Sequence, residues 1–102
     1  VTLIKTKFPT RNVIGVSEGA GPLADETVVI GAHYDHLGYG EPGSFPGSDG
    51  KVHYGADDNA SGTTGLLELA RRYGAIKNRQ GRRIVFAAFS GEEQGLFGSK
   101  HY

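Results

Sequence analysis

The segment "RRIVFAAFSGEE", residues 82–93, ends an uninterrupted apolar run on two adjacent glutamates, Glu92 and Glu93. Six apolar residues in a row, 84–89, predict a strand that is buried on both faces, as strands of parallel sheets are. A turn that simply faces water would account for a single Glu-Glu pair. Because neighbouring carboxylates repel each other, their position at a strand end raises the question of what lies beside them.

A second apolar run, "ETVVIGAHYD" (residues 26–35), also predicts a buried strand. Between the two runs, residues 59–78 show helical spacing of the apolar side chains, and Asn59 or Ser61 is a suitable N-cap. The apolar positions of this predicted helix are Leu66, Leu69, Ala70, Tyr73 and Ile76. Strand, helix and strand predict a βαβ unit with parallel strands and a right-handed crossover, hence an α/β fold. Residues 1–8 and 11–18 predict two further short strands near a sheet edge.

The composition limits the size and the partners of the protein. The 102 residues suffice for one domain with one modest core, and we treat residues 1–102 as a single, partial domain. Eleven basic and eleven acidic residues cancel, so we expect neither a nucleic-acid nor a membrane partner. The absence of Cys excludes disulfides and thiolate metal ligands. The chain also lacks Met, so we expect a processed form or part of a larger protein.

Polar residues gather where the predicted strands end and where the helix begins. Ligands of open α/β sheets bind outside the carboxyl ends of the strands. The motifs "HYDH" (33–36), "GADDN" (55–59) and "GEE" (91–93) all fall at this edge, and none of them contains Lys or Arg. Taken singly, such a His is usually structural and such an Asp pair is usually a helix cap. Together they favour a divalent metal, and the His and carboxylate ligands suit zinc, although cobalt or manganese could bind as well. The Gly-, Pro- and Ser-rich residues 37–54 predict a long loop beside this edge that is functional or mobile.

The same motifs carry a family resemblance. "GAHYDHLG" (31–38), "GADDNASGTTGLLELAR" (55–71) and "FAAFSGEEQGLFGS" (86–99), in this order and spacing, resemble the co-catalytic zinc aminopeptidases of the M28 peptidase type. The resemblance covers nearly the whole chain, but only the N-terminal part of that family's catalytic domain. It implies a three-layer α/β/α sandwich around a mixed, largely parallel sheet, of which the chain holds the N-terminal strands and one βαβ unit.

The resemblance also implies roles for five residues. His33 would bind one Zn²⁺, Glu93 the other, and Asp58 would bridge the two ions. Asp35 would accept a hydrogen bond from the His33 imidazole and fix its tautomer. Glu92 would be the general base that takes a proton from the metal-activated water. The peptide bond between Asp58 and Asn59 is often cis in such proteins.

Further expectations follow from the same resemblance. Family members take two more ligands, an acidic residue and a His, from beyond the region covered here, so we expect little or no activity from the isolated chain. The expected substrates are peptides with a free N-terminus. An uncovered sheet surface would favour self-association. Family members lean towards extracellular or periplasmic locations. His36 could form a hydrogen bond within its loop, whereas His53, His101 and Asp57 are expected to have no role at the metals.

Two other functions remain open at this point. A glutaminyl-cyclase-like acyltransferase would use one zinc ion and no hydrolytic water, and the presence of Asp58 and Glu92 favours hydrolysis over it. A non-catalytic module without metals would be expected to have lost its His and Glu ligands, whereas a fragment that only binds metal or assembles remains possible for this chain. Since His33, Asp58 and Glu93 are all present, the metallopeptidase is the preferred interpretation.

Overall fold

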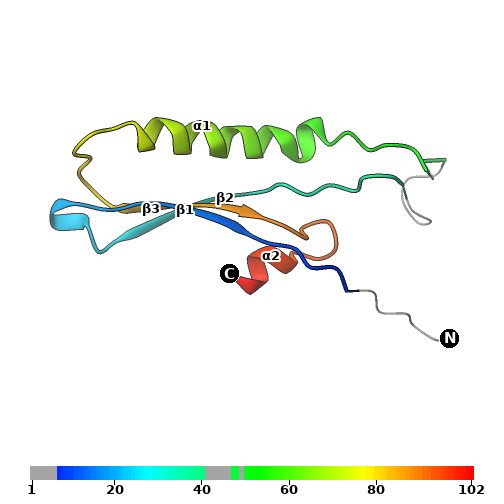
Figure 1. Ribbon diagram of the computed structural model, residues 1–102, viewed down its shortest axis with the longest axis horizontal. Coiled ribbons are helices and arrows are strands. Elements are labelled where there is room, and N and C mark those ends of the chain that lie inside the picture. Colours follow the sequence, from blue (N-terminus) through cyan, green and yellow to red (C-terminus); the bar gives the residue numbers. More distant parts are fainter. Residues whose placement is uncertain (1–6, 41–46, 49) are drawn as a thin grey trace.

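The computed structural model describes residues 7–40, 47–48 and 50–102. The described residues form a three-stranded mixed sheet with one long helix against it (Figure 1). The strands are β1 (Val13–Ser17), β2 (Thr27–His33) and β3 (Arg83–Phe89). The helices are α1 (Gly62–Gly74) and the short α2 (Phe97–His101), together with the single turn η1 (Gly21–Leu23) and the irregular segment η2 (Ala56–Ser61).

β3 is the central strand of this sheet. The order is β1-β3-β2, with β1 antiparallel and β2 parallel to β3. The βαβ unit with parallel strands, predicted from the two apolar runs, is therefore confirmed. In the parallel pair His33 lies opposite Phe89, so the two strands end side by side. This register brings the segments that follow each strand to one edge of the sheet.

The core lies between α1 and one face of the sheet. Its buried side chains are Leu66, Ile84 and Phe86, with Phe86 7% exposed. The helix contributes every third or fourth residue, as the apolar spacing predicts: Leu66, Ala70 and Tyr73 all contact this core. The Tyr73 and Phe86 rings lie 6.3 Å apart, within the range of a favourable aromatic pair.

Two details of the sequence prediction are wrong. β2 is not buried on both faces, because it lies at the edge of the described sheet: Val28 is 42% exposed and Val29 50%. The helix ends at Gly74, so Ile76 lies beyond it and is 52% exposed rather than part of the apolar stripe. Glycine near the end of a helix weakens its continuation, which is consistent with the earlier stop.

The remaining fold predictions fall partly outside the described residues or are not tested by the structure. Most of the predicted strand over residues 1–8 and part of the predicted loop over residues 37–54 fall outside the described residues. Figure 1 shows α2 on the opposite side of the sheet from α1, close to the end of β3. The complete three-layer sandwich, the single partial domain and self-association through the exposed sheet stay predictions. No helix among the described residues has the length and apolarity to cross a membrane.

Candidate metal centre

The ends of β2 and β3 are joined by a backbone hydrogen bond at the start of the polar motifs. The Tyr34 N–H donates to the Phe89 carbonyl at 2.9 Å, one residue beyond the last paired strand positions. Beyond this bond, the chain that follows β2 continues into Asp35. The chain that follows β3 turns at Gly91, whose φ of +69° favours glycine. The parallel register therefore sets the His33 motif against the Glu92–Glu93 pair.

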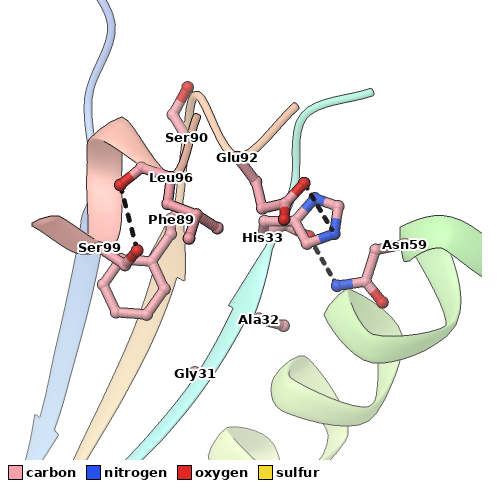
Figure 2. Close-up of a pocket in the computed structure, with 9 residues that line it drawn as sticks. All are labelled: Gly31, Ala32, His33, Asn59, Phe89, Ser90, Glu92, Leu96 and Ser99. Carbon is pink, nitrogen blue, oxygen red and sulfur yellow. Dashed lines mark hydrogen bonds and ion pairs between the residues drawn. The ribbon is translucent and has the colours of Figure 1, made fainter. Parts of the chain in front are cut away.

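His33 points its two ring nitrogens at different partners. Nδ1 lies 3.1 Å from the Asp35 backbone carbonyl, which can only accept, so Nδ1 carries a proton. Nε2 faces carboxylates instead, at 3.0 Å from Asp58 Oδ1 and 3.9 Å from Glu92 Oε2. Figure 2 shows the Glu92 side chain directed at the His33 ring from the end of β3. With Nδ1 occupied by the backbone, Nε2 is the atom available to a ligand.

The charges around His33 change its proton affinity. Partial burial alone would lower the pKa of the ring, but the hydrogen bond to the Asp35 carbonyl and the nearby carboxylates outweigh it. In order of effect these carboxylates are Glu92, Asp58 and Asp35, and the net result is that the pKa of His33 is raised above 6.5. The surroundings of Nε2 therefore favour a positive charge there, as a cation-binding site would.

The Asp35 carboxylate forms hydrogen bonds mainly with the backbone of Glu92 and Glu93. Its two oxygens accept the N–H groups of Glu92 and Glu93 at 3.2 and 3.3 Å. The distance from Oδ1 to His33 Nδ1 is 3.6 Å, too long for a good hydrogen bond, and the ring is held by the Asp35 carbonyl instead. The contact between Asp35 and His33 thus exists through the backbone, and the carboxylate fixes the turn that presents the glutamates.

The segment η2 brings Asp58 to the site. The peptide bond between Asp58 and Asn59 is cis, as expected from the resemblance. The Asn59 side chain donates to the His33 carbonyl at 3.1 Å and accepts the Gly62 N–H at 3.2 Å, so it caps the start of α1 while holding the end of β2 (Figure 2). Thr63 donates its hydroxyl to the same His33 carbonyl at 2.8 Å. The helix start and the strand end are therefore locked together.

Glu93 lies beside His36, a contact that the sequence did not predict. His36 Nδ1 is 2.8 Å from Glu93 Oε1, so this His binds a site residue rather than only its own loop. The "HYDH" motif was the only available signal, since it places His36 next to Asp35. Asp57, His53 and His101 belong to neither of the groups of possible metal ligands found among the described residues.

Those two groups contain all the predicted ligands. Donor atoms of His33, Glu92 and Glu93 lie within 4.8 Å of one another, and the same holds for His36, Asp58 and Glu93. The shared Glu93 and the 3.0 Å contact between His33 and Asp58 connect the groups. Imidazole and carboxylate donors at this density fit a zinc centre.

An open cavity of about 310 Å³ adjoins His33 and Glu92 (Figure 2). Its other walls come from β2, from the end of β3, from η2 and from α2 with the residue before it, and are mostly apolar. They are Gly31, Ala32, Asn59, Phe89, Ser90, Leu96 and Ser99. The candidate metal ligands therefore border a space that a small molecule can enter.

A set of hydrogen bonds next to the site was also not predicted from the sequence. The Asn12 side chain accepts the Ser90 N–H at 3.2 Å and donates to the Gly98 carbonyl at 2.8 Å. The hydroxyls of Thr10 and Ser90 contact each other as well, and Ser90 is buried. These contacts tie the end of β3 and α2 to the segment before β1. Nothing in the sequence marks Asn12 for this role.

Comparison with known proteins shows the family of this chain. A family model described as peptidase family M28 matches residues 12–102. The chain belongs to this family. Aminopeptidase YwaD of Bacillus subtilis is 36% identical over 97 residues, which are 95% of this chain and 18% of that protein. Leucine aminopeptidase 1 of Trichophyton rubrum is 32% identical over 106 residues, covering 98% of this chain and 26% of the relative.

A probable zinc metalloprotease of Pyrenophora tritici-repentis is 40% identical over 77 residues, which are 76% of this chain and 16% of the relative. The chain thus spans about a quarter or less of the curated relatives that it matches. No solved structure matches the chain. The M28 resemblance stated from the three motifs is confirmed, whereas the roles of the individual site residues stay predictions.

Proposed function

We propose that this chain supplies three ligands of a two-zinc peptidase centre, namely His33, Asp58 and Glu93, and that Glu92 is the general base. The observation that carries the proposal is the position of His33. Its Nδ1 is committed to a backbone carbonyl, and its Nε2 faces two carboxylates from two other segments of the chain. A ligand nitrogen whose other ring nitrogen is held by a backbone carbonyl is the usual arrangement of metal-binding His.

When bound, zinc supplies a lowered pKa for water and polarisation of the peptide carbonyl. The chain's own residues handle the protons. The Glu92 side chain is 35% exposed and only 3.9 Å from His33 Nε2, so it is close to the metal ligand and open to the cavity. Its carboxylate takes a proton from the attacking water and then donates it to the leaving amine. Asp35, through its hydrogen bonds to the Glu92 and Glu93 N–H groups, keeps both carboxylates at the site.

The proposed reaction is removal of N-terminal residues from peptides. Support comes from the names of relatives, among them aminopeptidases and a probable zinc metalloprotease. The zinc-dependent acyltransferase is less favoured, because the position of Glu92 beside His33 suits activation of a water molecule. No observation specifically supports a non-catalytic module.

The metal is tested by titrating Zn²⁺ into the purified chain by calorimetry. We expect binding in the wild type and its loss in Glu93→Ala, because Glu93 belongs to both groups of possible ligands. Glu18→Ala is the matched control: it removes an exposed glutamate whose partner is Arg83, on a different part of the sheet. Equal Zn²⁺ uptake by Glu93→Ala and Glu18→Ala would contradict the proposed centre.

The role of Glu92 is tested in the full-length protein with an amino-acid amide as substrate. Glu92→Gln keeps the size of the side chain but removes its ability to accept a proton. We expect kcat to fall by roughly 10²–10⁴-fold, the usual contribution of a general base, with Zn²⁺ content unchanged. A kcat close to the wild-type value would exclude Glu92 as the base. The isolated chain is expected to release little or no amino acid in the same assay.

A further inference from the structure

We propose that His36 is a positioning residue: its Nδ1–H holds one oxygen of Glu93, so that the other oxygen is aimed at the metal. The inference rests on the proposed function, since it concerns the same centre. It gives a part at the metal site to a residue for which the sequence predicted only a hydrogen bond within its own loop.

The geometry identifies His36 as the donor. Its Nδ1 lies 2.8 Å from Glu93 Oε1, the length of a charge-assisted N–H···O⁻ bond. An ionised carboxylate can only accept, so the proton is on Nδ1. Both side chains are largely shielded, at 23% exposed for His36 and 15% for Glu93, which makes this bond stronger than one at the open surface.

The His36 ring is itself held in place. A Cβ at Gly55 would come within 2.7 Å of ring atoms of His36, so the backbone of Gly55 lies directly against the imidazole. Gly55 has φ of +61° and immediately precedes η2, the segment that carries Asp58. The His53 ring lies edge-on to His36, with the ring centres 6.3 Å apart. One packed imidazole thus connects the segment of Asp58 with the side chain of Glu93.

This contact matters because Glu93 lies among other acidic groups. Glu92 is its neighbour in the chain, and Asp58 is close enough to share a ligand group with it. Without a donor, repulsion would favour rotamers of Glu93 that point away from the other carboxylates. Loss of a hydrogen bond to a metal ligand typically costs 10- to 100-fold in metal affinity.

The test is Zn²⁺ affinity of the chain by calorimetry for three variants. His36→Leu removes the donor and fills the space. His36→Asn places an amide N–H where Nδ1 was. His101→Leu is the matched control, since His101 is an exposed residue of α2 outside both ligand groups. We expect His36→Leu to weaken binding by roughly 10- to 100-fold, His36→Asn to retain most of the wild-type affinity, and His101→Leu to match the wild type.

A second measurement does not depend on zinc. In the metal-free chain, nitrogen NMR should show the Nδ1–H form of His36, and Glu93→Ala should remove that preference. The Nε2–H form in the wild type would overturn the inference.

The calorimetry separates the possible failures. Wild-type affinity in His36→Leu, with binding lost in Glu93→Ala, would overturn the role of His36 and leave the metal centre intact. Equal weakening in His36→Leu and His36→Asn would also overturn it, because the imidazole would then act as a ligand or as packing, not as a donor. Absence of Zn²⁺ binding by the wild type would overturn both proposals.

Discussion

Replacing Asp35 by Asn tests how the two glutamates are held at the site. The change keeps the size of the side chain and one carbonyl oxygen, but it removes the charge and turns the second acceptor into a donor. In the wild type both carboxylate oxygens accept backbone N–H groups, from Glu92 at 3.2 Å and from Glu93 at 3.3 Å. An Asn side chain can satisfy only one of them.

The magnitude follows from these two bonds. Hydrogen bonds to charged groups contribute about 1.5–3 kcal/mol each. These two, at 3.2 and 3.3 Å, lie at and just beyond the long end of the normal range, so the lower value applies. Losing one bond and weakening the other should reduce the free energy of opening this turn by about 1–2 kcal/mol. That change corresponds to a factor of roughly 5–30 in the open population.

Amide hydrogen exchange measures this opening directly, without metal or substrate. We expect the Glu92 and Glu93 amides to exchange roughly 5–30 times faster in Asp35→Asn. The Tyr34 amide, which donates to the Phe89 carbonyl at the end of the sheet, is the internal control and should keep its rate. Asp57→Asn is the matched variant, because it removes an equal charge from an exposed residue close by in η2.

Two results would refute the reasoning. Unchanged exchange at Glu92 and Glu93 would mean that the Asp35 carboxylate does not hold the turn. Equal acceleration at Tyr34 would mean that the substitution loosens the sheet as a whole, so that the effect is not specific to the glutamate pair.

Three further predictions concern stability. Phe86→Ala removes the largest side chain of the buried core and should lower the free energy of unfolding by about 3–5 kcal/mol in a urea titration, against a much smaller loss in Phe86→Leu. Gly98→Ala should lower the melting temperature, because a Cβ there would overlap the Ser90 carbonyl oxygen; an unchanged melting temperature would contradict this packing. Hydrogen bonds from Arg71 and, to a lesser degree, from Arg72 lower the pKa of Glu68 below 4.5. The stability that these bonds give to the folded protein is therefore present above pH 4.5 and is lost as the pH falls through the lowered pKa. Melting curves at pH 7 and pH 3 should show a smaller acid-induced loss in Glu68→Gln than in the wild type, and an equal loss would refute the coupling.

The sequence predicted the parts of the fold that follow from periodicity. The apolar run at 84–89 became the central strand, and Leu66, Ala70 and Tyr73 face the core as their spacing requires. Burial of β2 was not predictable in the same way. An unbroken apolar run indicates that a strand can be covered on both faces, but exposure depends on which elements lie beside it, and in the described sheet β2 lies at an edge.

The candidate site also has features that could be predicted from the sequence and others that could not. Parallel strands end together, so topology alone brings His33 and Glu92 to one edge. The partners of Asp35 and His36 depend on the turn at Gly91 and on side-chain rotamers, which no repeating pattern in the sequence encodes. Asn12 is more remote still, because its bonds to Ser90 and Gly98 join residues about eighty positions apart.

The glutamate pair at the end of the apolar strand now has a physical basis. Adjacent side chains on an extended strand point to opposite faces, so two neighbouring glutamates can serve one site only if the chain leaves the strand before them. It does so at Gly91, and the Glu92 carbonyl then accepts the N–H groups of Gly95 and Leu96 at 2.9 Å each, closing a turn. The Asp35 carboxylate accepts the Glu92 and Glu93 backbone N–H groups of that turn, and His36 holds the Glu93 side chain. The hydrogen bond from His36 therefore opposes the repulsion between the two carboxylates. In the proposed centre, one carboxylate would bind a cation while its neighbour would stay free to move a proton.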